Sequence, residues 1–302
     1  MKRLIVTADD FGAAREVNDA VEAAHLGGIL TAASLMVGAP AASDAVARAH
    51  RMPSLRVGLH LVLTDGRALL PPSAVPNLVD VSGHFRAGMV GAGAAMVFNP
   101  RARRQLAAEI AAQFEVFRAT GLALDHCNAH KHFHLHPVIG SLIAKIGRRF
   151  GLRAVRVPLE PQSVLSLVEP GPKAAPAWLT APWARLLRRR MAARGILTPD
   201  HVFGLRWSGA MTRARVGGLI RNLPEGLSEI YLHPATGGGF GDAAADYQYQ
   251  EEFEALLAPE TVAAARDPVL RLGGYADFLK SDVGGTVAQT SRNTGPNRSS
   301  TL

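Results

Sequence analysis

The sequence is poor in cysteine and in aromatic residues, and it has no long apolar run. Cys127 is the only cysteine among 302 residues, which excludes a scaffold held together by disulfides. No segment reaches the ~18 consecutive apolar residues of a transmembrane helix, and the apolar start of the chain meets Asp9 and Asp10 too soon for a signal peptide. Hydrophobic residues make up 48% of the chain, enough for a large core, so we expect a globular cytoplasmic protein.

The chain has more positive than negative charge. Lys and Arg number 33 and Asp and Glu 25, which gives a formal net charge of +8 at pH 7. Such a balance suits nucleic acid, an anionic membrane surface or simple solubility. Nucleic-acid binding usually adds a recognisable module or stacking aromatic residues to a basic face. Aromatic residues are only 6% of this chain and we find no such module, so we expect no nucleic-acid partner.

Short apolar segments alternate with helix-like segments along the chain. The pattern predicts strands at 4–8, 55–61, 122–127, 152–157 and 229–232, and helices at 15–26, 103–120 and 137–150. This alternation is typical of an α/β fold with a mainly parallel sheet, and so many units favour a closed or partly closed barrel. We expect one domain over residues 1–283, with a Gly-, Pro- and Ala-rich loop or cap at 66–98 and a disordered tail at 284–302.

Polar residues gather where the predicted strands end. These residues are Asp9 and Asp10, His60, the His-rich segment 126–136, Arg156 and His233. In parallel α/β folds, reactive side chains collect at the carboxyl ends of the strands, because the loops there meet around one mouth. We therefore expect these side chains to form a single site.

The His-rich segment predicts a metal site. Five of the eleven histidines lie between His126 and His136. A carboxylate and two imidazoles can hold a divalent metal and leave positions open for water and substrate. If the segment is extended, His130, His132 and His134 share one face. The alternative is a surface loop that binds metals without function, and the acids and histidines at other strand ends favour a functional site.

Each single residue also has a structural explanation. Adjacent acids such as Asp9 and Asp10 can cap a helix, or one can bind a metal while the other accepts a proton from water. His60 lies inside an apolar strand, where a lone histidine is more often a core residue than a ligand. His233 has the same ambiguity, and Arg156 suits an ordinary surface salt bridge.

Four motifs together resemble the YdjC-like carbohydrate deacetylase family, which includes the chito-oligosaccharide deacetylases. The motifs are TADDFG at 7–12, VGLHL at 57–61, HKHFH at 130–134 and LHPA at 232–235. They are spread over nearly the whole chain and are jointly specific. The segment 128–137, NAHKHFHLHP, is most similar to the branch associated with hopanoid biosynthesis.

The resemblance implies a distorted (β/α) barrel of the polysaccharide-deacetylase type and a divalent metal ion. By motif, Asp10, His60 and His130 are the metal ligands, Asp9 is the general base, and His233 is the general acid for the leaving amine. Two imidazoles and a carboxylate suit Zn²⁺, whereas relatives are commonly described with Mg²⁺.

One position departs from the family pattern. Chito-oligosaccharide members carry an aspartate two residues before the third ligand, where this chain has Asn128. An amide carries no charge and cannot act as a base, so Asn128 is left to orient His130 or the substrate. We expect Asn128, His132 and His134 to bind substrate, and Arg156 either to keep Asp9 ionised or to bind sugar oxygens.

The implied activity is metal-dependent removal of the acetyl group from an N-acetylglucosamine-type sugar, on a hopanoid glycolipid if the branch is right. The alternatives are a soluble chito-oligosaccharide deacetylase and a non-catalytic barrel that binds sugar or metal.

The composition of residues 177–194 is relevant to whether the protein binds lipid. They hold two of the three tryptophans and five arginines, a composition typical of a helix at an anionic membrane surface. An outer barrel helix with a solvated arginine face explains the same composition. Under the first interpretation the protein docks peripherally at the inner membrane.

Overall fold

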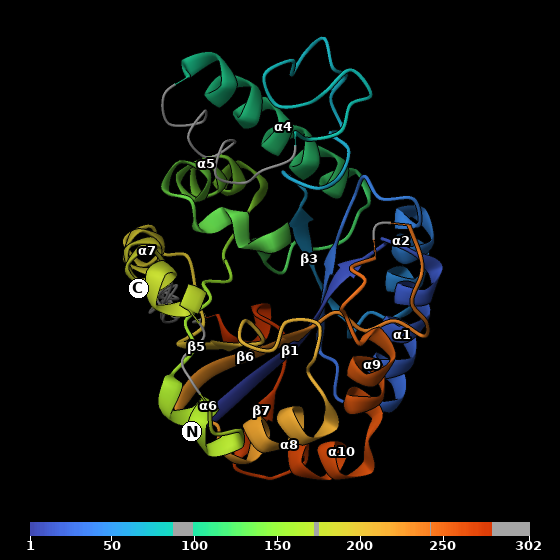
Figure 1. Ribbon diagram of the computed structural model, residues 1–302, viewed down its shortest axis with the longest axis vertical. Helices are drawn as coiled ribbons and strands as arrows, with labels where there is room; N and C mark the ends of the chain where they lie inside the picture. Colours follow the sequence, from blue (N-terminus) through green and yellow to red (C-terminus); the bar gives the residue numbers. More distant parts are fainter. Residues whose placement is uncertain (87–98, 172–174, 242, 280–302) are drawn as a thin grey trace, which may run out of the picture.

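The computed structural model describes residues 1–86, 99–171, 175–241 and 243–279, with the backbone alone at 175–180. Within these ranges a curled sheet of seven parallel strands forms the centre of the molecule (Figure 1). The strands are β1 (Lys2–Phe11), β2 (Ala32–Leu35), β3 (Arg56–Leu61), β4 (Cys127–Ala129), β5 (His201–Phe203), β6 (Gly226–Leu232) and β7 (Leu270–Leu272). Their order is β4-β3-β2-β1-β6-β5, and β7 pairs with the start of β1.

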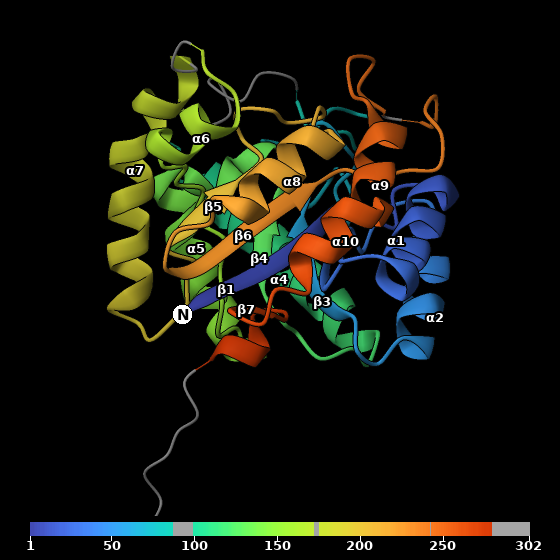
Figure 2. The same cartoon turned by 90° about the horizontal axis from the view of Figure 1, so that it is seen from below.

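Helices surround this sheet. They are α1 (Arg15–Gly27), α2 (Ala42–Arg51), α4 (Pro100–Ala119), α5 (Pro137–Gly147), α6 (Gln162–Val168), α7 (Ala175–Ala192), α8 (Arg213–Arg221), α9 (Tyr249–Leu257) and α10 (Pro259–Ala265), with short 3₁₀ turns η1 (His130–Leu135), η2 (Arg148–Phe150) and η3 (Ala276–Phe278). Figure 2 shows α1 and α2 on one side of the sheet and α6 and α7 on the other. Among the described helices, none combines the length and the apolar character needed to cross a membrane.

The sheet follows from buried apolar strands and well-defined helix starts. Leu4, Ile5 and Val6 of β1 are fully buried, as expected for a central parallel strand covered on both faces. Helix α4 starts at an asparagine cap, because the Asn99 side chain accepts the backbone N–H of Arg101 at 2.9 Å. β2, β5 and β7 were not predicted, since runs of three or four residues carry little periodicity.

The barrel closes irregularly between β4 and β5. Isolated parallel bridges join Cys127 to Val155 and Ala154 to Leu197. The backbone N–H of Val202 then donates to the carbonyl of Leu159 at 3.1 Å. These single contacts replace a regular strand ladder, which confirms the predicted distorted (β/α) barrel.

The predicted strand bounds were wrong on this side of the sheet. Residues 122–126 are irregular and β4 covers only Cys127–Ala129, while 152–157 contributes bridges instead of a strand. The segment 66–86 is a loop held by the antiparallel bridges Arg67–His84 and Val79–Phe85. Residues 87–98 of the predicted cap and the predicted tail at 284–302 lie outside the described residues.

Candidate metal centre and active site

A bulge at the end of β1 turns two adjacent carboxylates toward one pocket. In the register with β2, Ala8 pairs with Ala33 and Phe11 with Leu35, so β1 has one extra residue. Asp10 takes up this residue with a left-handed φ of 60°. Successive side chains of a regular strand point to opposite faces, but here Asp9 and Asp10 both line the same pocket. Backbone strain of this kind is typical of functional sites.

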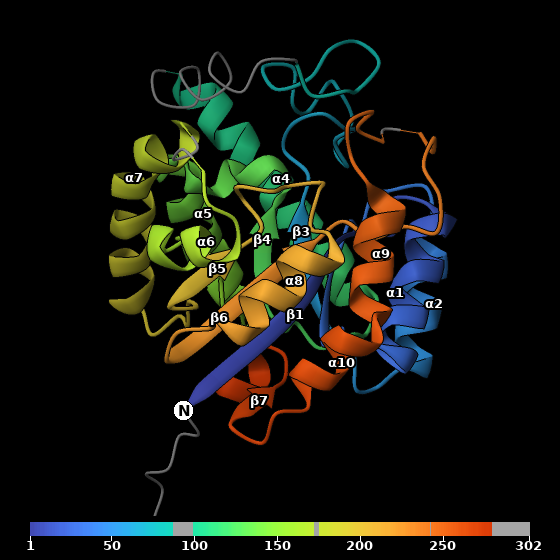
Figure 3. The same cartoon turned by 60° about the horizontal axis from the view of Figure 1, so that its bottom comes forward.

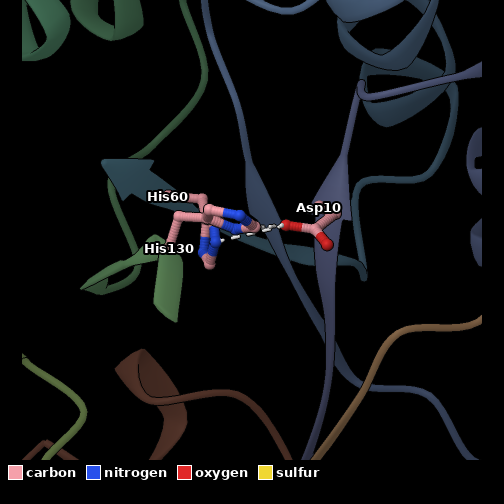
Figure 4. Close-up of side chains that lie close together, drawn as sticks. All are labelled: Asp10, His60 and His130. Carbon is pink, nitrogen blue, oxygen red and sulfur yellow. Dashed lines mark ion pairs between the residues drawn. The ribbon is translucent and has the colours of Figure 1, made fainter. Parts of the chain in front are cut away.

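Asp10, His60 and His130 meet at this bulge from three different elements. The Oδ1 atom of Asp10 lies 3.3 Å from Nε2 of His60 and 3.3 Å from Nδ1 of His130 (Figure 4). One ligand atom from each residue lies within 4.8 Å of the other two. Burial alone would raise the pKa of Asp10, but the facing imidazoles of His130 and His60, in their protonated form, hold it well below its usual value.

The hydrogen bonds around His60 fit a cation in this cluster. Its Nδ1 lies 2.8 Å from Oδ1 of Asn128, an oxygen that can only accept, so Nδ1 carries the proton. In the neutral ring, Nε2 then presents a lone pair to Oδ1 of Asp10, which is also an acceptor. Both atoms are buried, and among the described residues neither has a hydrogen-bond partner. Such unpaired buried acceptors call for an explanation, and a divalent cation between them satisfies both.

Asp9 lies beneath this cluster and is held by buried donors. The Arg156 guanidinium binds both carboxylate oxygens, with Nη2 at 3.0 Å from Oδ1. The amide of Asn128 donates to the same Oδ1 at 3.2 Å. Burial alone would raise the pKa of Asp9, but Arg156 and His60 outweigh it and lower this pKa below its usual value. Asp9 is therefore ionised.

Arg156 is itself fully buried between two acids. Its guanidinium pairs with Glu229 on β6 at 2.8 Å as well as with Asp9, and lies 4.4 Å from the centre of the Tyr231 ring. Glu229 also accepts hydrogen bonds from Thr7 and Tyr275. Of the two roles considered for Arg156, this geometry matches the one that keeps Asp9 ionised.

The His-rich segment is not extended. It forms the 3₁₀ turn η1, and Lys131 and His132 have left-handed φ values of 52° and 55°. The prediction that His130, His132 and His134 share one face is therefore wrong. The turns send His130 to Asp10, His132 to the hydroxyl of Tyr231 at 2.7 Å, and His134 into the interior.

Two of the residues expected to bind substrate are fully buried. Burial lowers the pKa of His134 to about 3, and its Nε2–H donates to the carbonyl of Arg156 at 3.0 Å. Asn128 is bonded to His60 and Asp9. Internal contacts therefore replace the expected substrate contacts at His134 and Asn128, whereas His132 does line the pocket.

His233 follows β6 directly and faces the same pocket. Its backbone N–H is held by the buried carboxylate of Glu252, and its Nδ1 lies 3.9 Å from this carboxylate without a hydrogen bond. The ring packs against Tyr247 with centroids 5.0 Å apart.

The pocket has a volume of about 490 Å³ and lies at the carboxyl ends of the strands. Asp9, Asp10, His60, His130, His132 and His233 all line it, and so do Asp65, Phe85, Lys131, Ser208, Tyr247 and Tyr249. Figure 3 shows the loop 66–86 and the segment after β6 at this same end of the molecule. The aromatic residues give the pocket an apolar wall beside its polar floor.

Sequence patterns did not reveal several residues of the site. Glu229 and Glu252 are fully buried acids. The one sequence signal for Glu229 is its position as an acid within the apolar segment of β6. Tyr247 lies in the irregular segment before α9 and Tyr249 is the first residue of that helix, so neither stands in a periodic pattern.

The fold and the Asp-His-His cluster together define an α/β barrel with a candidate metal centre at the carboxyl edge of its sheet. Residues 3–267 match the family model described as YdjC-like protein. The chain therefore belongs to this family.

Individual relatives agree with this assignment. A carbohydrate deacetylase from Geobacillus stearothermophilus is 30% identical over 281 residues, which cover 91% of this chain and 98% of the relative. Carbohydrate deacetylases from Brevibacillus brevis and Vibrio vulnificus are 38% and 39% identical over 49% of this chain and 56% of their own lengths. The crystal structure of an Enterococcus faecalis V583 protein named for cellobiose-phosphate cleavage superposes with a TM-score of 0.71 at 23% identity. It covers 92% of this chain and 99% of that one, and at this identity it shows the fold alone.

Proposed function

We propose that the protein is a metal-dependent carbohydrate deacetylase that hydrolyses the acetamide of an N-acetylglucosamine-type sugar. The observation that carries the proposal is the pair of buried, unpaired acceptors, Oδ1 of Asp10 and Nε2 of His60, 3.3 Å apart. His130 completes a three-ligand set, and the relatives named above are carbohydrate deacetylases.

Asp10, His60 and His130 would hold Zn²⁺ or Mg²⁺. When bound, such an ion supplies Lewis acidity toward an acetamide carbonyl oxygen and a water molecule. Three protein ligands would leave room for water and substrate on the ion, as in catalytic metal sites.

Asp9 is the proposed proton acceptor for the attacking water. It lines the pocket beside Asp10, and Arg156 keeps it ionised. The same guanidinium makes Asp9 a weak base, so proton transfer to it requires an acidic water molecule. Arg156 touches no part of the pocket surface and is a positioning residue.

His233 is the proposed proton donor to the leaving amine. An amine leaves poorly unless it is protonated, so an amide hydrolase needs a second proton carrier. The imidazole of His233 lines the pocket, and Glu252 fixes its backbone. The aromatic wall of Phe85, Tyr247 and Tyr249 suits the apolar face of a sugar ring.

The direct test is acetate release from N-acetylglucosaminyl substrates. We expect turnover by the purified protein, loss of turnover after a chelator removes metal, and recovery when Zn²⁺ or Mg²⁺ is added back. Metal analysis of protein purified without added ions identifies the native ion. Metal binding without acetate release from any sugar would support the non-catalytic barrel instead.

For the substrate itself, we propose an N-acetylglucosaminyl hopanoid glycolipid at a membrane surface. The similarity of 128–137 to the hopanoid-associated branch and the basic face of α7 support this choice. On α7, Trp183 is 52% exposed and Arg185 and Arg189 are also exposed, while Ala184 and Leu187 are buried against the barrel. The side chains of 177–180 lie outside the described residues.

Two measurements separate this substrate from a soluble one. Faster acetate release from the glycolipid than from diacetylchitobiose is expected, and the reverse order favours a chito-oligosaccharide deacetylase. Co-sedimentation with anionic vesicles, weakened by Arg185→Glu and Arg189→Glu, is expected for membrane docking. Protein that ignores such vesicles even at low salt would rule the docking out.

A further inference from the structure

A chain of buried polar side chains runs behind the metal cluster. Nδ1 of His126 lies 2.9 Å from Oδ2 of Asp125, and Nε2 of His126 lies 3.0 Å from Oγ of Ser34. The same Oγ lies 3.0 Å from Nδ2 of Asn128, whose Oδ1 meets His60. Ser34, His126 and Asn128 are fully buried and Asp125 is 4% exposed, so none of them reaches a substrate.

A carboxylate fixes the direction of the hydrogen bonds at the far end. Asp125 accepts the backbone N–H of Ala276 at 2.7 Å and that of Tyr275 at 3.2 Å. Its side chain is thus an acceptor toward His126, whose Nδ1 must carry the proton. In the neutral ring, Nε2 of His126 is then an acceptor, and the hydroxyl group of Ser34 donates a hydrogen bond to it.

A second carboxylate fixes the direction at the near end. The Asp9 carboxylate, which is paired with the Arg156 guanidinium, accepts from Asn128, so the NH₂ group of this amide faces Asp9. A flipped amide would set its oxygen against the carboxylate. The second N–H of the amide donates a hydrogen bond to Oγ of Ser34, whose own hydroxyl donates to Nε2 of His126. Each link therefore has only one possible direction.

We propose that Ser34 and His126, anchored by Asp125, are positioning residues that lock the amide of Asn128. The locked amide oxygen holds the proton of His60 on Nδ1 and leaves Nε2 free for a cation. This inference rests on the proposed metal centre. Partners behind a ligating histidine fix its tautomer and orientation, and replacing them typically weakens metal binding by 10–100-fold.

The residues around His126 leave room for its ring and hold the ring in place. A Cβ atom on Gly58 would lie 2.5 Å from the His126 ring, so a glycine in β3 makes room for it. The ring also stacks on Tyr275, with the two ring centroids 4.5 Å apart. Ser, His and Asp in this order resemble a hydrolytic triad, but Ser34 is fully buried and bonded to an amide, which excludes attack on a substrate.

The test is a double-mutant cycle on Zn²⁺ affinity, measured by competition with a chelator. We expect Ser34→Ala to weaken Zn²⁺ binding by about tenfold in the wild-type background and by less than about twofold in the Asn128→Ala background. Ser228→Ala is the matched control, because Ser228 is fully buried in the same sheet and its Oγ has no hydrogen-bond partner in the part of the chain that the structure describes. This control should bind Zn²⁺ as the wild type does.

Two results would overturn the inference: Ser34→Ala binding Zn²⁺ as tightly as Ser228→Ala, or losing the same factor in both backgrounds. A measurement on the wild-type protein tests the inference even if the variants fold poorly. In metal-free wild-type protein, the ¹⁵N spectrum of His126 should show the proton on Nδ1, and a proton on Nε2 would also overturn the inference. Wild-type protein that binds neither Zn²⁺ nor Mg²⁺ but has this tautomer would refute the proposed function and not the direction of these hydrogen bonds.

Discussion

The floor of the pocket and the ligand cluster above it use the same kinds of side chain in opposite ways. The floor consists of Asp9 at the pocket surface with Asn128, Arg156 and Glu229 buried behind it, and hydrogen bonds within the protein join these residues. The ligand cluster, formed by Asp10, His60 and His130, contains buried atoms that have no hydrogen-bond partner among the described residues. Groups saturated within the protein set position and charge, and of the four floor residues Asp9 alone also lines the pocket, whereas unsatisfied groups are available to a ligand.

The largest effect is expected in the ligand cluster. Asp10→Ala and His130→Ala should each reduce acetate release to background, because each removes one of three ligands. Metal content should fall with activity. Asp65→Asn, an acid elsewhere on the pocket wall, is the control and should keep its metal. Activity near wild type with unchanged metal content would contradict the assignment.

A floor residue should separate catalysis from metal binding. Asp9→Asn removes the proposed proton acceptor and leaves the ligand cluster intact, so kcat should fall by roughly 10²–10⁴-fold. Metal content should stay at the wild-type level, as measured by elemental analysis. If Asp9→Asn lost metal as Asp10→Ala does, the distinction between floor and cluster would be broken.

The floor should also contribute more to stability than a surface pair. Arg156→Met leaves Asp9 and Glu229 as uncompensated buried charges, which is expected to lower the free energy of unfolding by about 3–5 kcal/mol. Arg213→Met, which breaks the exposed pair with Glu254, should change it by less than about 1 kcal/mol. Urea denaturation of both variants checks the contrast, and equal losses would contradict it.

The smallest effect is expected at the pocket wall. Lys131 and Asp65 form an exposed pair at 2.8 Å, and the bond from Lys131 lowers the pKa of Asp65. Asp65→Asn should therefore cost less than about 1 kcal/mol of unfolding free energy at pH 7. A lowered pKa stabilises the folded state above the unfolded value of 3.8, and this contribution is lost as pH falls through the lower pKa of the folded state. A difference that does not shrink as the pH is lowered through this range would contradict the prediction.

The sequence predicted the fold class because short apolar segments alternate with helix-like segments. It singled out Asp9, Asp10, His60 and His130 because parallel strands bring their ends together. It did not predict how the side chains point. The turn at Lys131 and His132 depends on left-handed backbone angles that residue type does not reveal.

The sequence also did not predict the buried hydrogen bonds that link His126, Ser34 and Asn128. Ser34 lies in a strand of only four small or apolar residues, and its role depends on partners 92 and 94 positions away. The predicted substrate contacts at Asn128 and His134 failed for the same reason, since polar residue type does not distinguish an internal partner from an exposed one.

The bulge of β1 has a consequence for motion. The proposed base and the proposed ligand are neighbours along the main chain, and consecutive Cα atoms stay about 3.8 Å apart across a trans peptide whatever the rest of the molecule does. A change in the packing of the barrel can widen the distance from β1 to His60 on β3 and to His130 in η1. It cannot separate the Cα atoms of Asp9 and Asp10, so covalent bonds set the spacing of these two backbone positions, and the bulge sets only the directions of their side chains.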